Sequence, residues 1–80
     1  MSTLVFLVED DDDIRDMVRR HLDRSGAFRV VAFPNGARFL EACEQQLPEI
    51  VILDLNLPDT DGLALCRELR SWDATRTVPI

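Results

Sequence analysis

Two short apolar runs, each ending in acidic residues, constrain this sequence most. The runs cover residues 4–8 (Leu-Val-Phe-Leu-Val) and 50–53 (Ile-Val-Ile-Leu). Short apolar segments without polar alternation predict strands that are covered on both faces. The first run is followed by Glu9 and four aspartates, and the second by Asp54. In open α/β sheets ligands bind at the carboxyl ends of the strands, so these acids are candidate site residues.

The rest of the chain predicts helices that alternate with strands. We expect one helix after the acidic run and others over residues 37–45 and 63–71, a strand over Phe28–Phe33, and the opening of a fourth strand at residues 78–80. This alternation predicts an α/β fold with a parallel sheet and right-handed crossovers. The strand that carries Arg29 is the least apolar and fits a sheet edge, which gives the strand order 2-1-3.

Local signals indicate where the first helix begins and ends. Asp12 or Asp13 is expected to cap its N-terminus. Gly26 is suited to the left-handed position that ends a helix. His21 lies at helical spacing from apolar residues and is expected to have a half-buried packing role.

Composition excludes several classes of function. Fifteen acids against nine bases give a net charge of −6, which argues against nucleic-acid binding by this segment. No apolar run is long enough to span a membrane, and no signal peptide is visible. Cys43 and Cys66 stand apart in helical patterns. We expect both to be buried thiols in a reducing cytoplasm.

Glu9, Asp10 and Asp54 are expected to meet, because strands 1 and 3 are neighbours in the order 2-1-3. Carboxylates so close repel one another and must share protons or a cation. The alternative interpretation is that they are solvated loop acids and helix caps. Two acidic clusters at adjacent strand ends favour a metal site, and hard oxygen ligands on a partly open rim suit Mg²⁺.

Other sites with characteristic spacing do not fit. An EF-hand counted from Asp10 or Asp11 lacks the glycine and glutamate that its loop requires, and a zinc site lacks ligands because His21 is the only histidine. A carboxylate nucleophile remains: Asp54 could attack a phosphoryl group in line and form an aspartyl phosphate. In this arrangement Glu9 would hold a metal-bound water, and the backbone carbonyl of Asn56 could complete the coordination.

At these residues the chain resembles a known family. The segment Leu-Val-Glu-Asp-Asp at 7–11, the Ile-Arg helix after it, and the segment Asp54–Gly62 resemble the receiver domains of bacterial two-component response regulators. The resemblance implies that Asp54 is the phosphoacceptor, that Glu9 and Asp10 form the acidic pocket, and that Asn56 offers its carbonyl to Mg²⁺. It implies phosphoryl transfer from a histidine kinase or phosphotransfer protein. It also implies a flavodoxin-like (CheY-like) three-layer sandwich with strand order 2-1-3-4-5.

The sequence departs from the family pattern at its end. The family places a Thr or Ser after strand 4 and a Lys after strand 5, and both positions lie beyond Ile80. We therefore expect residues 1–80 to be a receiver domain that is incomplete at its C-terminal end, truncated after the start of strand 4. An open sheet edge and open apolar surface would make this segment weakly stable, or would pair it with a second copy as a homodimer.

Two other functions are weighed against phosphoryl acceptance. The first is a receiver-like module for protein interaction or dimerisation that works without phosphorylation. The second is a metal-dependent phosphohydrolase, which usually needs a second acid two residues past the nucleophile, where this chain has Asn56. We therefore expect no enzyme activity beyond Mg²⁺-assisted self-phosphorylation and dephosphorylation.

Overall fold

Strands and helices alternate along the chain as expected. The computed structural model describes residues 2–54, 56–73 and 75–80. Over these residues the elements are β1 (Thr3–Val8), α1 (Asp12–Asp23), β2 (Phe28–Phe33), α2 (Gly36–Gln45), β3 (Ile50–Leu53) and α3 (Gly62–Ser71). The strands form a parallel sheet in the order β2-β1-β3, which confirms the predicted order and the edge position of β2.

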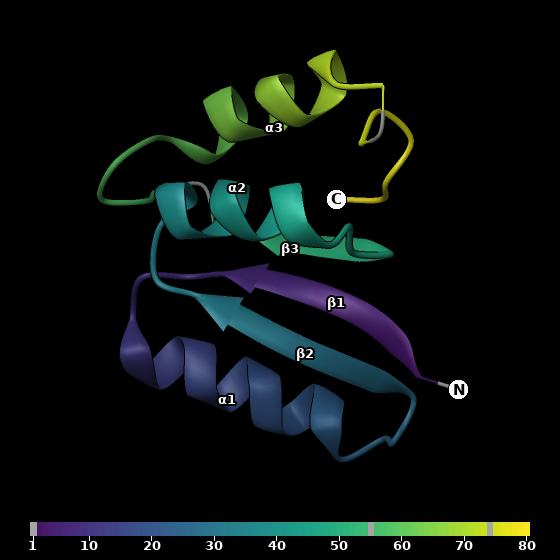
Figure 1. Cartoon of the computed structure of the whole chain (residues 1–80). Coiled ribbons are helices and arrows are strands. Elements are labelled where there is room, and N and C mark those ends of the chain that lie inside the picture. Colours follow the sequence, from purple (N-terminus) through teal and green to yellow (C-terminus); the bar gives the residue numbers. More distant parts are fainter. Residues whose placement is uncertain (1, 55, 74) are drawn as a thin grey trace.

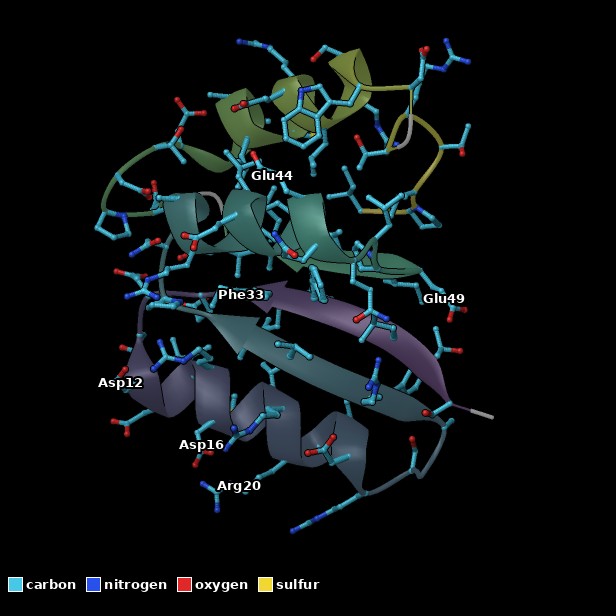
Figure 2. The ribbon with its side chains drawn as sticks, viewed as in Figure 1. Asp12, Asp16, Arg20, Phe33, Glu44 and Glu49 are labelled. Atoms are coloured by element: carbon cyan, nitrogen blue, oxygen red, sulfur yellow. The ribbon has the colours of Figure 1, made fainter. Side chains whose placement is uncertain are left out.

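The sheet separates the helices into two layers. Helix α1 lies on one side, and α2 and α3 lie on the other (Figure 1). The outer surface of α1 is charged: Asp12, Asp16 and Arg20 point away from the sheet (Figure 2), and Asp16 pairs with Arg20 at 2.6 Å. The arrangement is therefore a three-layer sandwich.

The main core lies between the sheet and the layer of α2 and α3. Its buried members come from β1, β3 and both helices: Leu4, Phe6, Val8, Phe39, Cys43, Val51, Leu65 and Leu69. Phe39 is fully buried and meets Phe6 and Phe33 edge-on, with ring centroids 6.2 and 6.1 Å away. Burial of this apolar surface holds α2 and α3 against the sheet and thereby fixes the loops at its carboxyl edge.

The opposite face of the sheet is less completely covered. No residue of α1 is buried, and Ile14 and Met17 are 45% and 60% exposed. Ile52 of β3 pairs in register with the buried Leu7 but is itself 38% exposed. Helix α1 therefore covers β1 better than it covers β3, which accords with the expected open apolar surface.

Some local expectations were wrong. Asp11, not Asp12 or Asp13, caps α1, because the helix begins at Asp12 and the extended residue before it accepts hydrogen bonds from the amides of Asp13 and Ile14, both at 2.9 Å. His21 is exposed rather than half-buried, since it lies on the solvent side of α1. Gly26 has the expected left-handed conformation, with φ of 71°.

The thiols and the C-terminal segment also differ in part from expectation. Cys43 is buried, but Cys66 is only partly so. Residues 78–80 form no strand. They contact β3 through the hydrogen bond that the amide of Val51 donates to the carbonyl of Pro79 at 2.9 Å, and this bond alone does not make a ladder. In the described part of the chain, no helix has the length and apolar character that crossing a membrane requires.

Candidate functional site

Strand register brings the predicted acids together. Val8 at the end of β1 pairs with Leu53 at the end of β3, and the amide of Asp54 donates to the carbonyl of Val8 at 3.0 Å. Glu9 and Asp54 therefore emerge side by side at the carboxyl edge of the sheet. One carboxylate oxygen from each of Glu9, Asp10 and Asp54 lies within 4.8 Å of the others. The structure thus places these three acids in one cluster.

The cluster is strained electrostatically. Partial burial raises the pKa of Glu9, and the negative charges of Asp54, Asp10 and Asp11 raise it further. The hydrogen bond that Glu9 accepts from the amide of Asp11, at 3.2 Å, acts in the opposite direction. A cation bound among these oxygens would offset the repulsion. Hard carboxylate oxygens on a partly exposed rim fit Mg²⁺, so the residues present suit the metal that the sequence predicted.

Asp54 presents one oxygen to its own loop. Its Oδ1 accepts a hydrogen bond from the amide of Asn56 at 3.2 Å, as in an Asx turn. Asn56 is exposed and forms an isolated antiparallel bridge with Asp61. This arrangement fixes the carboxylate of Asp54 at one oxygen. That the Asn56 carbonyl completes a metal site stays a prediction.

Arg15 contributes to the site but was missed in the sequence. Its Nη1 donates to the carbonyl of Glu9 at 2.9 Å and to that of Asp10 at 3.5 Å, and its other nitrogen pairs with Asp12. The side chain is only 22% exposed. Side chains of a helix lean toward its N-terminus, so a basic residue in the first turn can reach back to the loop before the helix. The position of Arg15 just after an acidic loop was therefore the signal in the sequence that could have indicated this contact. Arg15 therefore braces the backbone that carries Glu9 and Asp10.

Asp59 is a second residue that the sequence reasoning did not single out. Its two oxygens accept hydrogen bonds from the amides of Gly36 at 2.9 Å and Ala37 at 2.8 Å. These bonds lower the pKa of Asp59. The first turn of α2 contains no acidic residue. This lack was the only sign in the sequence that an acid from another segment could bind the amides at the N-terminus of α2.

Together, the parallel sheet in the order β2-β1-β3 and the acids at its carboxyl edge define a receiver-type α/β domain. The sequence model described as "Response regulator receiver domain" matches residues 5–80. The chain is 44% identical over 79 residues to the transcriptional regulatory protein CseB of Streptomyces coelicolor, a match that covers 99% of this chain and 32% of CseB. This chain therefore belongs to the response regulator receiver domain family of two-component systems.

Solved structures agree with this assignment. The N-terminal domain of a response regulator receiver protein from Methanoculleus marisnigri JR1 superposes with a TM-score of 0.89 at 28% identity, covering 96% of this chain and 62% of that one. The BeF3-activated receiver domain of RstA from Klebsiella pneumoniae gives 0.80 at 35% identity, covering 88% and 60%. The chain spans about a third of the length of CseB and less than two thirds of each solved chain. The flavodoxin-like fold is confirmed.

Proposed function

We propose that this chain is the phosphoacceptor module of a response regulator and that Asp54 receives a phosphoryl group from a histidine kinase or phosphotransfer protein. The observation that carries the proposal is the clustering of Glu9, Asp10 and Asp54 within 4.8 Å at the carboxyl edge of the sheet. CseB is described as a transcriptional regulatory protein, and we propose that this chain serves as the input module of such a regulator. Its two free thiols suit the reducing cytoplasm.

Glu9, Asp10, Asp54 and the backbone carbonyl of Asn56 would hold Mg²⁺. When bound, the ion supplies positive charge that offsets repulsion between the acids and the incoming phosphoryl oxygens. The chain's own residues then position the nucleophile. The amide of Asn56 holds Oδ1 of Asp54, which leaves the other oxygen to attack the phosphorus in line. An O–P bond forms to Asp54, the N–P bond of the phosphohistidine breaks, and its electron pair returns to the imidazole.

We propose no separate enzyme activity, because of the residue that stands two positions past Asp54. A phosphohydrolase with an aspartyl intermediate would need a group that protonates its leaving group near the nucleophile. Two residues past Asp54 this chain has Asn56, whose neutral amide cannot act as a general acid. We therefore propose that the chemistry is limited to gain and loss of the phosphoryl group on Asp54 itself.

The test uses a small phosphodonor. The protein is incubated with phosphoramidate or acetyl phosphate and Mg²⁺, and the phosphoprotein is measured by mass spectrometry and phosphate-affinity electrophoresis. We expect one hydroxylamine-sensitive phosphoryl group, lost in Asp54→Asn and after chelation of Mg²⁺. Asp13→Asn is the matched control, because Asp13 is an exposed acid of the same run that lies outside the cluster. Uptake that persists in Asp54→Asn, or no uptake by the wild type from these donors or a kinase, would contradict the proposal.

A further inference from the structure

The loop between β3 and α3 is fastened to the start of α2, a segment more than twenty residues earlier in the chain. Asp59 makes this connection through hydrogen bonds from Gly36 and Ala37, as described above. Both backbone amides belong to the first turn of α2, where no earlier carbonyl can receive them. Asn35 caps the same helix by accepting a bond from the amide of Arg38 at 2.9 Å. Two different segments therefore share the capping of one helix.

The contact is close as well as polar. Gly36 is buried, and a Cβ added there would lie 2.7 Å from Cγ2 of Thr60 and 3.4 Å from Oδ1 of Asp59. A side chain at position 36 would therefore push the loop away from the helix. Glycine at this position lets residues 59 and 60 rest directly on the backbone of α2.

The fastened loop is the one that follows the reactive carboxylate. At the start of this loop, the amide of Asn56 donates a hydrogen bond to Asp54. An antiparallel bridge between Asn56 and Asp61 then joins the two ends of the loop. Asp61 then caps α3 by accepting a bond from the amide of Ala64 at 2.6 Å. Residue 59 lies between the two bridged positions. Its bonds to α2 consequently fix the tip of a loop whose base carries Asn56.

We propose that Asp59 is a positioning residue of the phosphoacceptor site, which holds Asn56 in place by tying the β3–α3 loop to the N-terminus of α2. The proposal rests on the proposed function, because it concerns a loop that presents a backbone carbonyl to Mg²⁺. It assigns no contact between Asp59 and the phosphoryl group. Its effect is on the geometry that the metal requires, since groups behind metal ligands commonly set metal affinity.

The first experiment measures phosphorylation of the protein as a function of Mg²⁺ concentration. We expect Asp59→Ala to raise the half-saturating Mg²⁺ concentration about tenfold, the lower end of the range for groups that support metal ligands, with a smaller change in the rate at saturation. Asp59→Asn retains one acceptor oxygen and should lie between the wild type and Asp59→Ala. This ordering separates the effect of the two hydrogen bonds from a general loss of charge.

Asn35→Ala is the matched control. It removes a cap from the same helix but leaves the bonds of Asp59 in place, so it should lower thermal stability without changing the Mg²⁺ dependence. A half-saturating Mg²⁺ concentration in Asp59→Ala equal to that of the wild type would overturn the proposal. Equal shifts in Asp59→Ala and Asn35→Ala would also overturn it, because they would show a purely structural effect.

Amide hydrogen exchange provides a second measurement that does not depend on phosphorylation. Asp59→Ala should accelerate exchange at Asn56, whose amide donates to Asp54 at 3.2 Å, and Asn35→Ala should not. If the wild type takes up no phosphate, the proposed function fails, and the exchange rates alone still decide whether Asp59 holds the loop. Unchanged exchange at the Asn56 amide in Asp59→Ala would refute the positioning role.

Discussion

Neutralising one acid of the cluster should stabilise the protein when no divalent ion is present. Asp10 is the best position for the change, because it is the exposed member of the cluster, so that the loss of its charge disturbs little packing. Two unit charges 4.8 Å apart, the outer limit for these oxygens, repel by about 1 kcal/mol at the dielectric constant of water and about 3.5 kcal/mol at an effective value of 20. The exposure of Asp10 favours the lower figure.

Asp10→Asn relieves repulsion from both Glu9 and Asp54. We expect its free energy of unfolding to exceed that of the wild type by about 1–2 kcal/mol in low salt with a chelator present. For a domain of this size, each kcal/mol raises the melting temperature by about 4–8 °C. The difference should shrink in high salt, because the Debye length falls to about 3 Å at 1 M. Thermal and urea melts followed by circular dichroism measure it.

Mg²⁺ should reverse the order of the two proteins. A bound ion would stabilise the folded state according to its affinity, and Asp10→Asn removes one of its proposed ligands. The matched control is Glu44→Gln, the same change of charge at an exposed position about 12 Å along α2 from Gly36. If Asp10→Asn is no more stable than Glu44→Gln without divalent ions, or if Mg²⁺ stabilises wild type and Asp10→Asn equally, the account of the cluster is wrong.

Four further predictions concern the loop contact, the core, the acidic cluster and the thiols. Gly36→Ala should lower the melting temperature, because its Cβ would crowd Cγ2 of Thr60. Adding Thr60→Ser, which removes Cγ2, should restore the melting temperature in the double variant. Equal melting temperatures for the single and double variants would contradict this. Phe39→Ala should cost about 3–5 kcal/mol in urea melts, because the ring is fully buried among two others. Because the pKa of Glu9 is raised in the folded state, the charged carboxylate destabilises the fold as pH rises. Without metal, Glu9→Gln should therefore have a higher free energy of unfolding than the wild type at pH 7. This difference should disappear below pH 4.5, where the Glu9 carboxyl is protonated in both the folded and the unfolded state. Burial raises the pKa of Cys43 to about 11, so alkylation of the native protein at pH 8 should modify Cys66 first.

The sequence predicted the parts of the fold that depend on local pattern. Apolar runs indicated the strands, and parallel pairing then required that Glu9 and Asp54 lie at the same edge. The unpredicted features are side-chain contacts. The cap at Asp11 depends on which of several adjacent aspartates has extended backbone angles. The contacts of Arg15 depend on its rotamer, and those of Asp59 join segments 22 and 23 residues apart. Periodicity carries no information about such contacts.

The close fit between Gly36 and the tip of the β3–α3 loop limits which loops from other proteins this chain can accept. A chimaera that transplants residues 54–62 from another protein also replaces the surface that rests on α2. The transplanted loop will clash with α2 unless it is equally small where Thr60 meets Gly36, or unless residue 36 is exchanged together with the loop. The loop of residues 54–62 and the start of α2 at Gly36 should therefore be exchanged together.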